Sequence, residues 1–193
     1  MLDIVLASAS PRRYEILKRR KYNIDVIPSN YDEQINGLQY SDELVKNCAY
    51  QKALEVKNRV GDETLIVSAD TVVVNDGVIL GKPKDKDEAF KMLRDLSNKT
   101  HFVATAVCLM YKGKEITGVD KTFVVFRELS DSDILRYIKD KNPLDKAGSY
   151  GIQDKDFDFA IKLDGNLDNV IGFPMNLFVN MLSICINDKP HYL

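Results

Sequence analysis

The sequence predicts an α/β protein built on one mixed sheet with helices on its faces, and three observations carry this prediction. Residues 3–28 read as strand, helix and strand, the pattern of an α/β layer. Residues 64–74 are largely apolar, as expected of a central strand covered on both faces. The long strand-like runs 100–111 and 115–127 flank Lys112-Gly113-Lys114, which predicts an antiparallel hairpin. A mixed sheet with mostly antiparallel edges therefore fits better than a doubly wound parallel one.

Caps, turns and periodicity justify the elements in order. We expect strands over residues 3–7, 23–28, 64–74, 78–80, 100–111, 115–127 and 157–163, and helices over 11–20, 42–58, 85–97, 130–140 and 175–186. Ser10 should cap the first helix through its hydroxyl, with Pro11 at the first helical position. The stretch Ser41-Asp42-Glu43-Leu44 is close to a capping box. Asn75-Asp76-Gly77 predicts a hairpin turn, and the polar residues 145–153, with two glycines, predict a site loop.

Length, charge and cysteine content limit the class of protein. A chain of 193 residues predicts one domain over residues 1–193. Its net charge of −2, with no aromatic–basic stripe, argues against nucleic acid and anionic membranes as partners. Three widely spaced cysteines in apolar runs indicate buried free thiols in a reducing compartment. No signal-like or membrane-spanning stretch is recognised, so we expect a cytoplasmic protein.

The first turn of the chain, Leu6-Ala7-Ser8-Ala9-Ser10-Pro11-Arg12-Arg13, is a candidate phosphate site. Small residues let a ligand approach the backbone, and the free N–H groups at a helix start favour an anion. Arg12 and Arg13 add planar forks that suit phosphate oxygens. The alternative is an ordinary strand-to-helix turn with solvated arginines, and the spacing alone does not decide between the two.

Two carboxylates are candidates for chemistry. Asp70 directly follows the apolar run 65–67, where a charge is costly unless something pairs with it. A divalent cation, a basic partner or a general-base role would each account for it, and so would an Asp that caps local N–H groups at a strand end. Glu33 lies in a polar loop and is either a second site carboxylate or a solvated charge.

Two lysines are the remaining candidate site residues. Lys82 stands between Gly81 and Pro83, where a turn can direct it at phosphate, although a solvated lysine is equally compatible. Lys52 is one of several helix lysines and by itself indicates only a solvated face. Basic groups with one or two carboxylates at loop ends suit a metal-bound polyphosphate, because carboxylates take Mg²⁺ or Mn²⁺ while Arg and Lys neutralise phosphate.

Several blocks of this sequence resemble those of a known family. The first turn resembles the signature of the Maf proteins, which are nucleoside triphosphate pyrophosphatases. The similarity continues in the family's order through Asp32-Glu33-Gln34, Lys52-Ala53, Ala69-Asp70-Thr71-Val72-Val73, Gly81-Lys82-Pro83, residues 145–153 and Asn169-Val170-Ile171-Gly172-Phe173-Pro174. The departures from the family pattern, at Ala106, Phe173 and Met175, lie outside the site positions named below.

The resemblance implies a fold like that of Maf and inosine triphosphatase, with two lobes around a cleft, and a homodimer in many members. It implies hydrolysis of a nucleoside triphosphate to the monophosphate and pyrophosphate with a divalent metal, Mg²⁺ or Mn²⁺. The block 145–153 is similar to the branch that acts on dTTP and UTP, with removal of modified pyrimidine nucleotides as a further role.

The resemblance also assigns roles to individual residues. It places Asp70 at the position of the general base and Glu33 at an acidic, metal-linked position. Either Glu33 or Asp70 would hold the metal, and for Asp70 the roles of metal ligand and general base compete, a choice that the sequence does not make. The resemblance places substrate specificity at Arg12, Thr71 and Gln153. The phosphate-contacting positions fall on Ser8, Arg13, Lys52 and Lys82.

Two other functions fit the same residues. One keeps the chemistry but changes the base, toward 7-methyl-GTP or other modified nucleotides. The other is a nucleotide-binding regulator of cell division or septum formation without turnover. Two carboxylates beside the basic set favour an enzyme, because a pure binder has little need of a group that activates water.

Overall fold

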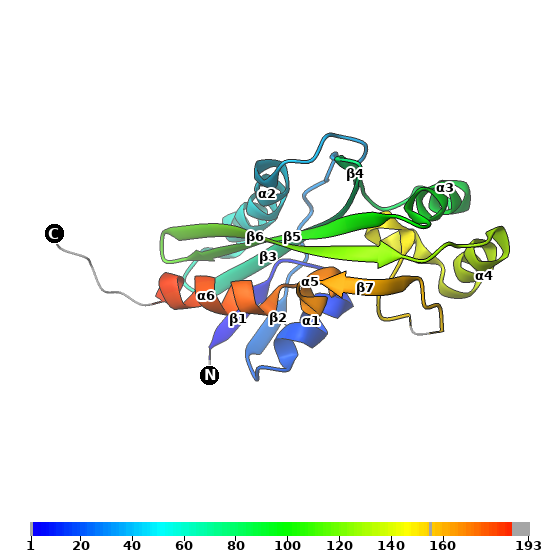
Figure 1. The fold of residues 1–193 in the computed structure, drawn as a ribbon. Helices are drawn as coiled ribbons and strands as arrows, with labels where there is room; N and C mark the ends of the chain where they lie inside the picture. Colours follow the sequence, from blue (N-terminus) through cyan, green and yellow to red (C-terminus); the bar gives the residue numbers. More distant parts are fainter. Residues whose placement is uncertain (1, 155, 187–193) are drawn as a thin grey trace.

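The structure, a computed structural model, describes residues 2–154 and 156–186. Its centre is one seven-stranded sheet in the order β2-β1-β3-β5-β6-β7, with β4 paired to β3 outside this path (Figure 1). The strands are β1 Asp3–Leu6, β2 Asn23–Val26, β3 Leu65–Asn75, β4 Val78–Leu80, β5 Thr100–Tyr111, β6 Lys114–Phe126 and β7 Ala160–Asp164. β1 runs parallel to β2 and β3, and every other pairing is antiparallel. The predicted mixed sheet is thus confirmed.

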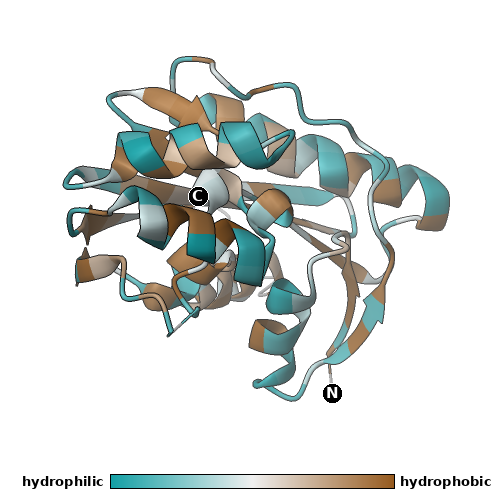
Figure 2. Ribbon diagram, turned by 90° about the vertical axis from the view of Figure 1, so that its right-hand side faces the viewer, coloured by the Kyte–Doolittle hydropathy of each residue, from teal (hydrophilic) through white to brown (hydrophobic). Residues whose placement is uncertain are grey.

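Helices cover both faces of the sheet and one end of it (Figure 1). They are α1 Pro11–Lys18, α2 Asp42–Val60, α3 Lys86–Leu96, α4 Asp131–Lys141, α5 Leu167–Ile171 and α6 Met175–Ile186. α2 packs on one face of β3 and β5, whereas α1 and α6 contribute to a second apolar cluster on the other face. α3 and α4 enclose a third cluster with the far ends of β5 and β6. Hydrophilic and hydrophobic segments both occur along the helices visible in Figure 2, as expected of helices that pack one face on a core.

The helix caps were predicted with one error. The Ser41 hydroxyl accepts a hydrogen bond from the Leu44 N–H, and Ser130 forms a full capping box with Asp133. Ser10 occupies the N-cap position of α1, but its side chain makes no capping bond. Instead its backbone N–H donates to Oγ of Ser8 at 3.2 Å. The loop before α1 is therefore held by Ser8.

The strand predicted over residues 64–74 is confirmed as β3, which runs unbroken through the polar stretch between its two apolar halves. Asp70 therefore lies in the middle of the strand, and the alternative of an Asp that caps a strand end is wrong. Short elements were missed: the five-residue α5 and the 3-10 turns Pro143–Asp145 and Ala147–Ser149. Segments this short carry too few residues for a periodic pattern.

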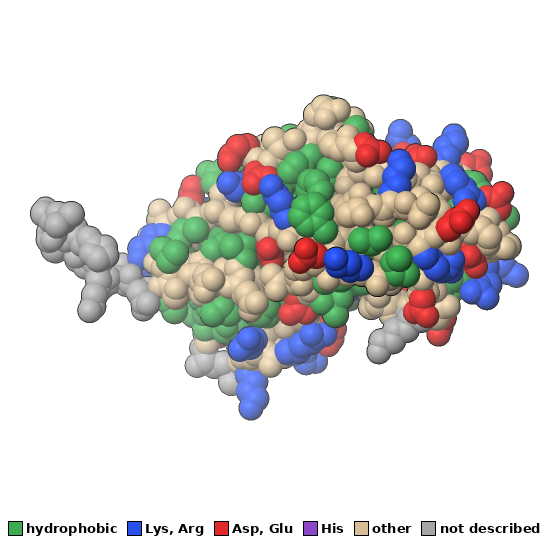
Figure 3. Space-filling view, in the orientation of Figure 1, with side chains coloured by type: hydrophobic (Ala, Val, Ile, Leu, Met, Phe, Trp, Pro, Cys, Tyr) green, Lys and Arg blue, Asp and Glu red, His purple; other side chains and the backbone are tan. Residues whose placement is uncertain are grey.

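Other expectations concern the thiols and the surface. Cys48, Cys108 and Cys185 are free and buried, as predicted, and burial raises the pKa of Cys48 and Cys108 to about 12. In residues 2–154 and 156–186, no helix has the length and apolar character needed to cross a membrane. Acidic and basic side chains are interspersed over the face drawn in Figure 3.

His101 makes the stability of this fold dependent on acid. Its ring is buried against Phe126 and Tyr150, and burial lowers its pKa from 6.5 to about 4. Between these two pH values the unfolded chain binds a proton that the folded protein does not, so stability falls as the pH falls. We expect this group to cost about 2 kcal/mol near pH 5. Urea unfolding of wild type and His101→Gln from neutral pH downward should show the wild type losing stability more steeply, and parallel losses would contradict the assignment.

Candidate active site

One cavity of about 620 Å³ collects every site residue predicted from the sequence. Its wall is made by the loop between β1 and α1, the loop after β2, the inner face of α2, the middle of β3, the turn after β4 and the loop before β7. The predicted residues that line it are Ser8, Arg12, Arg13, Glu33, Lys52, Asp70, Thr71, Lys82 and Gln153. The cavity thus joins segments that lie far apart in the sequence.

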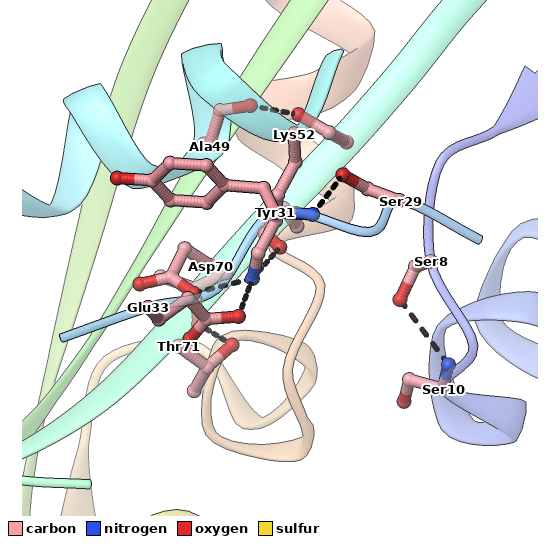
Figure 4. Close-up of polar contacts among 12 residues, drawn as sticks. Ser8, Ser10, Ser29, Tyr31, Glu33, Ala49, Lys52, Asp70 and Thr71 are labelled. Carbon is pink, nitrogen blue, oxygen red and sulfur yellow. Dashed lines mark hydrogen bonds and ion pairs between the residues drawn. The ribbon is translucent and has the colours of Figure 1, made fainter. Parts of the chain in front are cut away.

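Asp70, Lys52 and Glu33 form a charged cluster in the cavity wall (Figure 4). Asp70 is only 1% exposed, and its Oδ1 accepts from Nζ of Lys52 at 2.6 Å. The same ammonium forms an ion pair with Glu33 and reaches the carbonyl oxygen of Ala69 at 3.4 Å. Lys52 is therefore buried between two carboxylates, and the alternative of a lysine on a solvated helix face is wrong. The amphipathic pattern placed it on α2 but could not place the carboxylates opposite.

The two carboxylates of this cluster differ in proton affinity. Burial, opposed by the charge of Lys52 and reinforced by the nearby charge of Glu33, raises the pKa of Asp70 to about 6. Burial also acts to raise the pKa of Glu33, but Lys52 outweighs it and the pKa is lowered. The second oxygen of Asp70, Oδ2, is buried and has no hydrogen-bond partner among the described residues. Asp70 is thus the group better suited to take up a proton near neutral pH.

Arg13 holds three parts of the cavity together. Its Nε donates to the carbonyl oxygen of Gly172 at 2.9 Å, and Nη1 donates to Oγ of Ser8 at 3.0 Å. Nη2 donates to Oγ1 of Thr71 at 3.0 Å, and that oxygen lies 3.0 Å from Oγ1 of the buried Thr105. A guanidinium has five N–H donors, so these contacts leave two that can face a phosphate.

Arg12, the neighbouring arginine, reaches across the cavity to a residue without a predicted role. Its Nη1 lies 3.0 Å from Oδ2 of Asp145 in the first 3-10 turn. Lys82 and Gln153 are exposed at the cavity wall. The turn that carries Lys82 is fixed because the N–H of Gly81 donates to Oδ1 of Asn36 at 2.9 Å.

Sequence reasoning marked the loop 145–153 as a site but missed what its residues do. Asp145, Lys146 and Tyr150 all line the cavity. Gly148 adopts a φ of +64°, and a Cβ there would stand 2.7 Å from Cγ2 of Val73, so only glycine fits. The polar composition of the loop predicted its location, whereas the packing on β3 has no local signature.

Comparison with known proteins gives consistent results. The family model described as Maf-like protein matches residues 3–185. A dTTP/UTP pyrophosphatase of Thermococcus gammatolerans is 48% identical over 90% of this chain and 92% of its own length. One of Clostridium beijerinckii is 42% identical over 94% of this chain and 98% of its own length.

Among solved structures, a nucleoside-triphosphatase (dITP/XTP pyrophosphatase) of Mycobacterium abscessus superposes with a TM-score of 0.46 at 16% identity, covering 66% of this chain and 76% of its own. The family model spans nearly the whole chain, and the curated relatives match it over nine-tenths of its length or more. From these sequence matches, we conclude that the chain belongs to the Maf family.

Proposed function

We propose that this protein hydrolyses dTTP and UTP to the nucleoside monophosphate and pyrophosphate. The observation that carries the proposal is the Asp70–Lys52–Glu33 cluster, with Asp70 and Lys52 buried, in the wall of a cavity that also holds four further cationic side chains. Such a site combines a proton acceptor with charges that neutralise a polyphosphate. The curated relatives that match nearly the whole chain carry the name dTTP/UTP pyrophosphatase, which supports the choice of substrate.

In the proposed mechanism, the triphosphate lies over the loop that Ser8 and Arg13 hold in place. Arg13 and Lys82 neutralise its oxygens. Lys52 keeps Glu33 ionised and orients Oδ1 of Asp70, so that the unpartnered Oδ2 accepts a proton from the attacking water. Water attacks the α-phosphorus and pyrophosphate leaves. Positioning of the reactants and neutralisation of charge supply most of the acceleration in reactions of this class.

The donor set fits a divalent metal. Both carboxylates pair with the ammonium of Lys52, and Oδ2 of Asp70 is a buried oxygen that has no hydrogen-bond partner among the described residues. Mg²⁺ typically binds through one or two carboxylates together with substrate phosphates. This mode suits a site where, within residues 2–154 and 156–186, no group of three or more His, Cys, Asp or Glu residues gathers as a metal cage. We propose that Glu33 or Asp70 would hold Mg²⁺ or Mn²⁺, which would stabilise charge on the leaving pyrophosphate. For Asp70 this role competes with that of the general base.

For the base, we propose that Arg12, Thr71 and Gln153 form the recognition side of the cavity. A Gln amide offers one acceptor and one pair of donors, which match the imide edge of uracil and thymine. A base that leaves these groups unpaired is rejected. The homodimer that the family resemblance implies and the cytoplasmic location expected from the sequence stay predictions.

Pyrophosphate release from a panel of nucleotides tests the proposed function. Each of dTTP, UTP, CTP, GTP, 7-methyl-GTP and ITP is incubated with Mg²⁺ or Mn²⁺ and, in parallel, with a chelator. We expect release from dTTP and UTP that the chelator abolishes. Release chiefly from 7-methyl-GTP or ITP would overturn the assignment of the base, and binding without any release would favour a regulator.

A further inference from the structure

A second polar cluster ties the loop that carries Gln153 to α4. Oδ2 of Asp154 accepts from Nζ of Lys146 at 2.6 Å and from the hydroxyl of Tyr137 on α4, also at 2.6 Å. The same hydroxyl accepts the backbone N–H of Gly151 at 2.8 Å. The side chains of Lys146 and Asp154 are only 11% and 15% exposed. Both ends of the loop are therefore tied to each other and to α4.

Asp154 is ionised in this cluster. Burial acts to raise its pKa, but the hydrogen bonds from Lys146 and Tyr137 outweigh burial and the pKa is lowered. Charge-assisted hydrogen bonds of this length are about twice as strong as neutral ones. The carboxylate is thus a fixed negative charge and a fixed acceptor beside the loop.

The amide of Gln153 and that carboxylate lie on the same side of Gly151, and no hydrogen bond joins these two described side chains, so the carboxylate acts on the amide through its charge. A Cβ on Gly151 would stand 2.8 Å from Oδ2 of Asp154 and 3.1 Å from Nε2 of Gln153, so both atoms lie over the same glycine. The amide nitrogen is the end of the Gln153 side chain that faces this point. A carboxylate there favours the NH₂ end of the amide and disfavours its oxygen, because ionised Asp accepts hydrogen bonds and donates none.

The orientation of this amide matters because a freely turning amide cannot distinguish uracil from cytosine. Uracil offers an N3–H donor beside the O4 acceptor, and cytosine offers an N3 acceptor beside the N4 donor pair. One orientation of a Gln amide pairs with the first edge, and the orientation turned by half a rotation pairs with the second. Selection between the two bases therefore requires a group that fixes the amide.

We propose that Asp154, held by Lys146 and Tyr137, is a positioning residue that fixes the amide orientation of Gln153 and so selects uracil and thymine over cytosine. This inference rests on the proposed function, because it deepens the role of the same cavity. It assigns a purpose to three residues outside the predicted site set. Gly151 is part of the same arrangement, because any side chain at this position would displace the carboxylate or the amide.

The test compares UTP with CTP in Asp154→Asn and in Tyr137→Phe. Asparagine keeps the size of the side chain but can donate as well as accept, so it no longer selects one orientation. Tyr137→Phe is the milder change, which removes one hydroxyl and keeps the ring, and it serves if the first variant does not fold. In both we expect the ratio of kcat/KM for UTP over CTP to fall about tenfold, chiefly through KM.

Tyr50→Phe is the matched control, because its hydroxyl bonds Glu115 outside the cavity, and it should leave the ratio unchanged. Each variant is also combined with Gln153→Ala, because a positioning effect requires the Gln153 amide whereas a general disturbance of the cavity does not. In the Gln153→Ala background we expect no further fall in the ratio. An unchanged ratio in folded Asp154→Asn and Tyr137→Phe, or a full additional fall without Gln153, would overturn the inference.

Calorimetric binding of UMP and CMP repeats the comparison without turnover. If the wild type releases no pyrophosphate yet prefers UMP, and Asp154→Asn loses that preference, the proposed function fails while the inference stands. If the wild type binds UMP no better than CMP, the inference fails whatever the enzyme hydrolyses.

Discussion

Asp70→Asn is expected to retain nucleotide binding and lose turnover by about 10²–10⁴-fold, the range attributed to a general base. Asparagine keeps the size of the side chain and an oxygen that can accept from Lys52, so the Lys52–Glu33 pair remains in place. What disappears is the ability of the buried Oδ2 to take a proton from water. The measurement is kcat for dTTP, with the affinity for a non-hydrolysable dTTP analogue determined by calorimetry.

Two controls make this result interpretable. The melting temperature shows whether the buried amide is tolerated, and the metal dependence of the residual rate shows whether Asp70 also acts as a ligand. Turnover near the wild-type value would rule out Asp70 as the base. Equal losses of binding and turnover would show instead that Asp70 serves to hold the substrate.

Lys52→Met is expected to cost about 3–5 kcal/mol of stability, the largest change we predict for folding. The substitution leaves Asp70 and Glu33 beside each other in the cavity wall with no cation between them. Lys57→Met is the matched control, because Lys57 lies on the same helix and also pairs with two carboxylates, Asp62 and Glu115, but at the surface. Chemical denaturation of both variants at neutral pH measures the difference, and equal losses would contradict the account.

The loss in Lys52→Met should also depend on pH in a defined direction. Lys52 opposes the effect of burial on Asp70, so without it the pKa of Asp70 in the folded protein rises above about 6. The folded variant then binds a proton that the unfolded chain, with an Asp pKa of about 4, has released. Stability therefore falls as the pH rises from about 4 through the folded pKa, more steeply than in the wild type. A loss that grows toward acid would contradict this cause.

The fold was predictable where its signals are local. Capping sequences fixed the starts of α2 and α4, and the apolar run of β3 marked the centre of the sheet. The strand that contains Asp70 was predicted, but the residue that pairs with its buried carboxylate was not. The free-energy cost of burying the Asp70 carboxylate is offset by Lys52 on α2, and this tertiary contact has no pattern in the sequence.

For the site, the family resemblance identified residues that one cavity now brings together, but it did not predict their partners. Arg12 contacts Asp145, and Arg13 is largely engaged by the chain itself. The Asp154–Lys146–Tyr137 cluster joins α4 to the loop through side chains that have no role assigned from the sequence. Hydrogen bonds between distant segments follow from the packing of the sheet and helices, which single-residue patterns do not encode.

The bond that is broken tests the central claim most directly. Wild type and Asp70→Asn are incubated with dTTP and the divalent metal in ¹⁸O-labelled water, and the products are separated and weighed by mass spectrometry. The account predicts dTMP carrying the label, together with unlabelled pyrophosphate, from the wild type, and little of either from Asp70→Asn. Formation of dTDP and labelled phosphate would contradict it, because water would then have attacked the γ-phosphorus.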